Sequence, residues 1–300
     1  MKVFYSDHFL IPLPVGHRFP MPKYAHLHES VVQAGLSGLQ FVSSEPATDE
    51  QLCLVHAGDY VKRMTHGEMS DKEMRRIGFP WSEQLVERAR LAVGGTIGTC
   101  RAAFQDGLAA NLAGGTHHAY PDHGEGYCIF NDAAVAIRAL QREDLVRKVV
   151  VLDCDVHQGN GTAAIFAGDL DVFTFSIHGQ KNFPFHKEVS SLDVALPDGC
   201  NDACFLDALQ PALKESLERA KADLAIYIAG ADPFEDDRLG RMSVSKAGLL
   251  KRDQIVLSAC QSISLPTAIV MGGGYARQVE DTVSIHLQTI SLAAFMAAGF

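Results

Sequence analysis

The sequence predicts an α/β fold in which helices cover both faces of a central, mostly parallel β-sheet. Three observations support this prediction. Short apolar runs alternate along the chain with longer amphipathic segments, as they do in βαβ units. Several apolar runs end in glycines followed by Asp, His or Tyr, and such sheets bind ligands at the carboxyl ends of their strands. No repeat, low-complexity tract or linker divides the chain, so residues 1–300 are expected to form one domain.

Each expected element follows from its local sequence. Apolar runs predict strands at residues 2–5, 109–112, 148–153, 172–177, 223–229 and 267–271. Amphipathic segments predict helices at residues 83–104, 132–141, 202–221 and 245–262, and from residue 279 onward. Ser82 is expected to cap the first of these helices, and Thr48 with Gln51 forms a capping box for a further one. Residues 67–80 are polar and then interrupted by Gly and Pro, which predicts a surface excursion.

The composition argues against several classes of protein. The 300 residues are 47% hydrophobic and 21% charged, with a formal net charge of −10. Direct nucleic-acid binding is therefore not expected, because phosphate contacts need clustered Lys and Arg. The short basic cluster of Lys72, Arg75 and Arg76 is flanked by acidic residues and is expected to be a solvated face. No apolar run approaches the ~20 residues that span a bilayer, so no membrane association is expected.

The cysteines indicate the compartment. All seven are scattered, and none belongs to a Cys-x-x-Cys pair. This pattern favours free thiols in a reducing compartment over a disulfide framework or a structural zinc site. The N-terminus lacks the long apolar core of a signal peptide. These features predict a cytoplasmic protein.

Residues 153–161 (DCDVHQGNG) are the most informative stretch of the chain. They follow the apolar run at residues 149–152, so two carboxylates and an imidazole stand where a buried strand ends. Side chains two residues apart on an extended chain point to the same side, which lets Asp155 and His157 converge on one ion. Because buried charges without a partner are strongly unfavourable, a metal ion is the leading explanation.

Asp232 follows the strand expected at residues 223–229 and is the candidate third ligand. Three protein ligands and an open fourth position are typical of catalytic zinc, whose bound water becomes acidic enough to attack near neutral pH. Gly159 and Asn160 occupy the places where a dinuclear site would need further carboxylates, so one metal is expected. Asp153 is better suited to fixing the tautomer of a histidine.

Two more strand ends carry groups suited to hydrolysis. His117 and His118 follow a Gly-Gly pair and offer a general base with a partner for proton transfer. Tyr275 follows three glycines and is a candidate donor to the oxyanion that develops on an attacked carbonyl. Each motif alone has a plainer interpretation as a polar loop, surface histidines or a flexible turn. Their occurrence at four strand ends of one chain favours a catalytic site.

In this combination and order the motifs resemble those of the zinc-dependent histone deacetylase family, whose members share an arginase-like three-layer α/β fold. The resemblance is clearest from Gly94 to Tyr275. Residues 114–118 (GGTHH) resemble the paired-histidine motif of the family, and residues 153–161 resemble its metal motif. The later motifs match GAD, ending at Asp232, and GGY, ending at Tyr275. Three further stretches are most similar to the class IV branch and its bacterial relatives: DRLG at 237–240, SVS at 243–245 and GLLKRD at 248–253.

The resemblance implies a role for each residue type. It implies one Zn²⁺ per chain, bound by Asp155, His157 and Asp232. It implies that the catalytic groups are His117, His118, Tyr275, Asp153 and Asn160, with Asp153 bonded to His117. The channel for the acylated lysine side chain would be lined by Gly126, Tyr127 and Phe183. A potassium ion beneath the zinc would be held by Ser176 and by backbone oxygens of Asp153, Asp155 and His157.

One position departs from the class I pattern of the family. Asn160, and not an aspartate, would pair with His118. Without that negative charge the pKa of His118 is expected to be lower than that of an Asp-paired histidine. Other branches of the family also carry Asn here, so the departure does not argue against activity.

Taken together, these features predict a zinc-dependent amidohydrolase that removes acetyl or longer acyl groups from N-acyl-lysine or a similar acylated amine. The class IV resemblance implies a preference for long fatty acyl groups. Two alternatives stay open: an amidohydrolase for acetylated polyamines or other small molecules, and a non-catalytic metal-binding sensor or scaffold. The retention of His117, His118 and Tyr275 favours an enzyme over the last of these.

Overall fold

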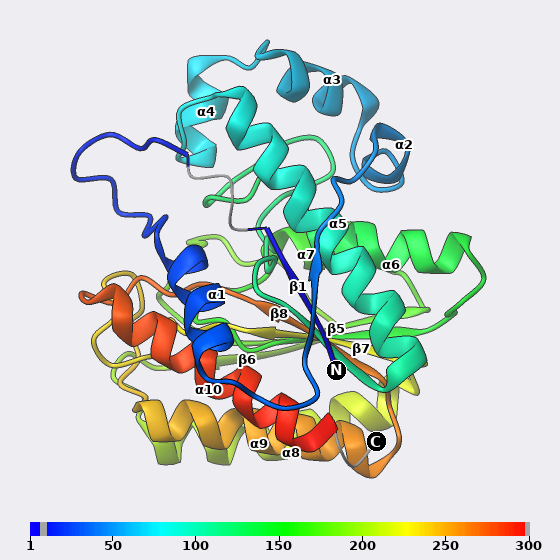
Figure 1. Cartoon of the computed structure of the whole chain (residues 1–300), viewed down its shortest axis with the longest axis vertical. Coiled ribbons are helices and arrows are strands. Elements are labelled where there is room, and N and C mark those ends of the chain that lie inside the picture. Colours follow the sequence, from blue (N-terminus) through cyan, green and yellow to red (C-terminus); the bar gives the residue numbers. More distant parts are fainter. Residues whose placement is uncertain (7–10, 298–300) are drawn as a thin grey trace.

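Eight strands form one sheet at the centre of the computed structural model, which describes residues 1–6 and 11–297 (Figure 1). Their order across the sheet is β2-β1-β3-β8-β7-β4-β5-β6, and each pair of neighbours is parallel. The strands are β1 (Lys2–Tyr5), β2 (Gln40–Ser43), β3 (Leu108–Asn111), β4 (Val149–Asp153), β5 (Val172–Gly179), β6 (Leu192–Leu196), β7 (Leu224–Ala229) and β8 (Thr267–Met271).

Helices cover both faces of the sheet, as expected from the sequence (Figure 1). One face carries α5 (Glu83–Asp106), α6 (Asp132–Arg142) and α7 (Asn160–Ile165), with α2 (Asp49–Leu52), α3 (Gly58–His66) and α4 (Asp71–Ile77) beyond them. The other face carries α1 (Lys23–Gln33), α8 (Asp202–Ala220), α9 (Lys246–Ser262) and α10 (Val279–Ala297). Within the described part of the chain, none of these helices combines the length and apolar character needed to cross a membrane.

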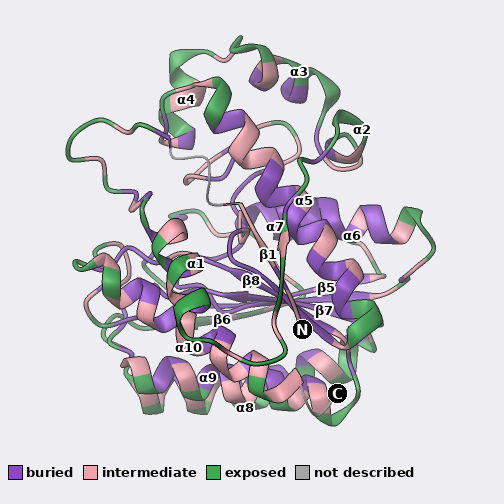
Figure 2. Cartoon of the chain, in the orientation of Figure 1, coloured by how far each residue is buried: buried purple, intermediate pink, exposed green. Residues whose placement is uncertain are grey.

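The core is divided into two layers by the sheet. Val149 and Val151 pack on the side of α5 and α6, whereas Val150 and Leu152 pack on the side of α8 and α9. This division follows from the alternation of side chains along a strand. Figure 2 shows the result: the central strands and the inner sides of α5 and α6 are buried, and the outward sides of the helices are largely exposed. A parallel sheet covered on both faces explains why its central strands are continuous apolar runs.

The strands that carry the chemical motifs are neighbours. β3, β8, β7 and β4 stand side by side in the middle of the sheet. Because these strands are parallel, the loops that follow them meet at one edge. The motifs at residues 114–118, 153–161, 230–232 and 272–275 are therefore brought to one place by the strand order.

Sequence patterns did not reveal the edge strands or several short helices. β2 and β6 are partly exposed edge strands, each only four or five residues long, and neither has a fully apolar run. Residues 67–80 are not simply a surface excursion, because they contain α4. Ser70 caps this helix by accepting from the backbone N–H of Glu73, whose side chain accepts in return from the backbone N–H of Ser70. This capping box was the local signal for α4.

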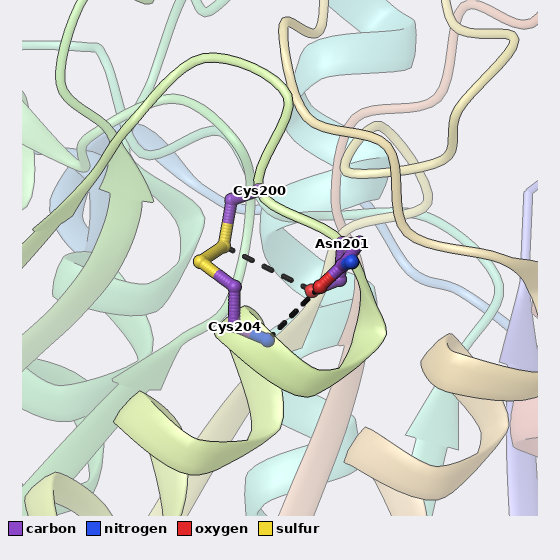
Figure 3. Close-up of a disulfide and its surroundings, with 3 residues drawn as sticks. All are labelled: Cys200, Asn201 and Cys204. Atoms are coloured by element: carbon purple, nitrogen blue, oxygen red, sulfur yellow. Dashed lines mark hydrogen bonds between the residues drawn. A yellow bond between two sulfur atoms is a disulfide. The ribbon is translucent and has the colours of Figure 1, made fainter.

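The prediction that all seven cysteines are free thiols is wrong for one pair. Cys200 and Cys204 form a disulfide at the start of α8 (Figure 3). The side chain of Asn201 caps the helix by accepting from the backbone N–H of Cys204 over 3.1 Å. The resulting turn brings the two Cα atoms to 5.4 Å, within the range that a disulfide requires. The other five cysteines are free.

A buried ion pair supports the loops that follow β4 and β7. Arg252 and Asp253 of α9 are 0% and 1% exposed, and Arg252 Nη2 lies 2.8 Å from Asp253 Oδ1. Arg252 Nη1 also donates to the backbone oxygens of Cys154 and Gly230, over 3.3 and 2.5 Å. The hydroxyl of Tyr227 donates to Asp253 over 2.5 Å. The pair therefore joins α9 to both loops.

We expect Arg252→Ala to lower the free energy of unfolding by about 3–5 kcal/mol, because it leaves the charge of Asp253 buried and unpaired. Urea denaturation of the wild type and of the Arg252→Ala variant measures this difference in the free energy of unfolding. Lys251→Ala is the matched control, since Lys251 is the exposed neighbour on the same helix. A loss below about 1 kcal/mol for Arg252→Ala, comparable to an ordinary surface substitution, would show that the ion pair does not stabilise these loops.

Candidate active site

Three buried side chains converge where β4 and β7 end: Asp155 and His157 after β4, and Asp232 after β7. His157 Nδ1 lies 3.0 Å from Asp155 Oδ1 and 3.1 Å from Asp232 Oδ2. One ligand atom from each residue lies within 4.8 Å of the other two. Two ligands bonded to one zinc ion at about 2.0–2.1 Å are themselves roughly 3 Å apart. This arrangement can therefore hold a divalent metal ion.

Backbone hydrogen bonds aim the two carboxylates. Gly273 N–H donates to Asp155 Oδ2 over 2.6 Å, and Val156 N–H donates to Asp232 Oδ1 over 2.9 Å. A Cβ atom at Gly273 would lie only 1.9 Å from Asp232 Oδ2. The backbone after β8 must therefore be glycine here, because it approaches the carboxylate too closely for any side chain.

The charges in this cluster favour a cation. Asp155 and Asp232 are 1% and 0% exposed. Burial, followed by the negative charge of Asp155, raises the pKa of Asp232 to about 7. A divalent cation between the carboxylates would remove this repulsion. Two carboxylates and one imidazole are also a donor set that zinc accepts.

His117 is held by Asp153, the last residue of β4. Its Nδ1 lies 2.7 Å from Asp153 Oδ2. Burial alone would lower the pKa of His117, but the charges of Asp153 and Asp155 outweigh it and raise this pKa to about 9. The loop that carries His117 is fixed by Asp132, whose carboxylate accepts from the backbone N–H groups of residues 115–116 over 3.1 and 2.7 Å. His117 is therefore positioned and positively charged near neutral pH.

His118 has a different partner and the opposite charge state. Its Nδ1 lies 2.6 Å from Asn160 Oδ1. The amide nitrogen of Asn160 donates to the Tyr120 hydroxyl and to a Glu125 carboxylate oxygen, each over 3.1 Å. The amide oxygen must then accept from Nδ1–H of His118, which leaves Nε2 as a proton acceptor. Burial, followed by the charge of His117, holds the pKa of His118 well below its usual value, so His118 is neutral.

Tyr275 stands beside the metal-ligand cluster, with its ring centre 6.3 Å from that of His157. Its backbone N–H donates to Asp237 Oδ2 over 2.6 Å, which fixes the turn after β8. Burial, followed by the carboxylates of Asp232 and Asp155, raises the pKa of Tyr275 well above its usual value. The hydroxyl therefore keeps its proton and is available as a hydrogen-bond donor.

A channel of about 450 Å³ leads from the surface to these groups. Gly126, Tyr127 and Phe183 line it, and the ring of Phe183 stands edge-to-face with that of His118 at 4.9 Å. A Cβ atom at Gly126 would lie 2.7 Å from His118 Cδ2, and its φ is +56°. Tyr127 also has a positive φ, 67°, and its backbone N–H donates to Ile77 O over 2.7 Å. Such strain in a non-glycine residue persists only where the surroundings hold it.

A smaller cavity of about 40 Å³ adjoins the inner side of the cluster. His117, His118 and Tyr275 face it together with Lys23 and other residues. Lys23 is 3% exposed, and its Nζ lies 5.4 Å from the centre of the Tyr275 ring. The cavity has room for only a few water-sized groups.

The structure thus brings the predicted metal, catalytic and channel residues to one site. Ser176, the predicted potassium ligand, pairs in register with Asp153 across β4 and β5. Sequence analysis assigned no role in the site to four residues that hold it together or face it: Lys23, Glu125, Asp132 and Asp237, the last of which begins the DRLG stretch at 237–240. None of them has a spacing to the other site residues that would distinguish it from a surface charge.

Comparison with known proteins agrees with this geometry. The family model of the histone deacetylase domain matches residues 17–290. An uncharacterized protein of Picosynechococcus sp. is 45% identical, over 95% of this chain and 95% of its own length. The acetoin utilization protein AcuC of Staphylococcus aureus is 29% identical, over 80% of this chain and 67% of its own length.

A solved structure, described as that of an HDAC homologue from Aquifex aeolicus, has the same fold. It matches with a TM-score of 0.84 at 23% identity, over 98% of this chain and 84% of the other. This likeness confirms the expected arginase-like three-layer fold. Because the family model covers most of the chain, the protein belongs to the histone deacetylase family and is a hydrolase of the deacetylase type.

Proposed function

We propose that this protein is a zinc-dependent deacylase that hydrolyses N-acyl-lysine or a similar acylated amine. The observation that carries the proposal is the convergence of three buried ligands, a neutral histidine and a protonated tyrosine at the base of one channel. The contact between Asn160 and His118, which leaves Nε2 of His118 as a proton acceptor, supports an enzyme over a metal-binding scaffold. The domain is proposed to span residues 1–300.

Asp155, His157 and Asp232 would hold one zinc ion per chain. A zinc ion there supplies Lewis-acid chemistry, which polarises a carbonyl group and makes a water molecule acidic near neutral pH. The neutral His118 takes a proton from the attacking water at Nε2 and returns it to the departing amine. The cationic His117 stabilises the negative charge that develops, and Asp153 keeps His117 charged. Tyr275 donates its hydroxyl hydrogen bond to the carbonyl oxygen.

The cavity of about 40 Å³ bears on the length of the acyl group. It adjoins His117, His118 and Tyr275, and has little room for a long chain. This supports a short acyl group, acetyl foremost, over the long fatty acyl preference implied by the class IV resemblance. The class IV affiliation, the potassium site at Asp153, Asp155, His157 and Ser176, and the cytoplasmic location stay predictions.

For the metal, we expect one zinc ion per chain by elemental analysis. A chelator should abolish hydrolysis, and added zinc should restore it. Asp232→Ala should bind zinc much more weakly, because it removes one of three ligands. Two metal ions per chain, or full activity after complete removal of metal, would contradict the assignment.

For Tyr275→Phe, we expect kcat to fall by about 10²–10³, the effect of deleting one oxyanion donor. The ring and its packing are retained, so zinc content and the thermal midpoint should not change. Steady-state kinetics, elemental analysis and thermal denaturation on this variant measure all three. A wild-type kcat would remove the Tyr275 hydroxyl from the mechanism.

For Asn160→Asp, we expect the acidic limb of the kcat/KM pH profile to move upward by about 1–3 pH units. A carboxylate beside Nδ1 raises the pKa of His118, and the general base must be neutral to act, so activity is lost at a higher pH. Because the new carboxylate would also lie beside Glu125, the double variant Asn160→Asp/Glu125→Gln serves as the control that removes this repulsion. An unshifted acidic limb in both variants would show that His118 is not the base.

A further inference from the structure

Five cationic side chains line the outer part of the channel. They come from four separate segments and are exposed, whereas His118 and Tyr275 at the base are buried. We call them the basic rim: Arg18, Arg75, Arg76, Lys181 and Arg241. Among the described residues that line this channel, none is acidic. A rim of one sign is unexpected in a chain whose formal net charge is −10.

Nearby carboxylates neutralise the basic rim only in part. Lys181 and Arg241 share one carboxylate, that of Asp198, at 3.9 and 3.1 Å. Within residues 1–6 and 11–297, no carboxylate oxygen lies within 4 Å of Arg18, Arg75 or Arg76.

Glu73, one of two acidic residues of α4, is bonded to groups other than Arg75 and Arg76. It accepts from Arg63 over 2.8 Å and from the Ser70 hydroxyl over 2.6 Å. The rim therefore has an excess of positive charge.

The arginines of α4 are held at the channel by backbone contacts. Gly126 N–H donates to Arg76 O over 3.3 Å, next to the bond between Tyr127 N–H and Ile77 O. Arginines in the last turn of a helix also interact favourably with the helix dipole. That explanation does not reach Arg18, Lys181 or Arg241, which lie in loops. Arg75 and Arg76 are exposed, as expected from the sequence, and they also line the channel.

We propose that the basic rim binds negative charge on the substrate. On this inference, which rests on the deacylase function proposed above, the preferred substrate is an acylated amine that carries carboxylate or phosphate groups near the channel mouth. A cleft lined by charges of one sign raises the local concentration of ligands of the opposite sign. Arginine forks are well matched to carboxylate and phosphate oxygens.

The same charges disfavour two other kinds of substrate. An acetylated polyamine keeps positive charges on its remaining nitrogens and would be repelled at the rim. A lysine-rich peptide around the acylated lysine would be repelled in the same way. The basic rim therefore favours anionic substrates over the polyamine alternative.

Matched substrate pairs test this inference on the zinc-loaded protein. One pair is Nε-acetyl-lysine, capped at its α-amine, with a free α-carboxylate or with a carboxamide. The second is an acetyl-lysine peptide flanked by Glu or by Gln. We expect the anionic member to have a kcat/KM about tenfold higher, because each exposed ion pair contributes a factor of roughly 1.5 to 5. A preference in the first pair only identifies a free carboxylate as the source, and one in the second only identifies an acidic peptide.

Added salt and a monoacetylated diamine extend the test. The preference for the anionic member should shrink toward unity as the salt concentration rises from about 0.05 to 0.5 M. The monoacetylated diamine should be the poorest substrate of the set. A ratio near one in both substrate pairs at low salt, or a preference for the diamine, would overturn the inference.

Variants then place the effect at the rim. Arg75→Gln/Arg76→Gln should reduce the anionic-to-neutral ratio of kcat/KM at least threefold, with an unchanged thermal midpoint. The matched control is Lys214→Gln/Lys251→Gln, which removes the same charge from exposed positions on α8 and α9, across the sheet. An unchanged ratio in the arginine variant, or an equal reduction in the control, would overturn the role of the rim.

The wild-type results separate failure of this inference from failure of the proposed function. If the zinc-loaded wild type hydrolyses neither member of either pair, the deacylase proposal itself fails. If it hydrolyses both members without preference, only the proposed role of the basic rim is rejected.

Discussion

The convergence of two buried carboxylates on one imidazole is the constraint on which the rest of the structure depends. Asp155 and Asp232 repel each other, and burial increases that repulsion. Hydrogen bonds hold the two carboxylates in place despite this repulsion. The backbone N–H groups of Val156 and Gly273 donate to them. Arg252 donates to backbone oxygens of the loops that follow β4 and β7. These contacts keep the ligands in place before any cation arrives, and a preformed ligand set loses little conformational freedom on binding.

The two adjacent histidines show how partners assign different roles to the same side chain. His117 and His118 are both buried and share one loop. A carboxylate faces the Nδ1 of His117, and an amide oxygen faces the Nδ1 of His118. The charged partner stabilises an imidazolium, whereas the neutral partner fixes a tautomer without stabilising the cation. One histidine is therefore a cation and the other is neutral at the same pH, and in the proposed deacylase the neutral one would act as the base.

Charge is distributed over the site in two layers. Beneath the base of the channel, Asp155 and Asp232 belong to a cluster that could hold a metal ion, and the mouth of the channel contains the basic rim. The two layers are joined by residues 126–127, whose backbone N–H groups bond to the end of α4. The left-handed conformation of Tyr127 allows this connection and also places its ring along the channel. The position of the rim is thus mechanically linked to the wall of the channel.

Local patterns in the sequence determined the central strands, the main helices and the identity of the metal-ligand and catalytic candidates. They did so because apolar runs, capping residues and the two-residue spacing of Asp155 and His157 act over a few residues. Only the tertiary structure decided what depends on residues far apart in the chain. The order β3-β8-β7-β4 brings Asp232 to His157, a helical turn brings Cys200 to Cys204, and α4 brings Arg75 to the channel. Edge strands and single charged residues such as Glu125 could not be predicted, since their role is set by neighbours that no local pattern specifies.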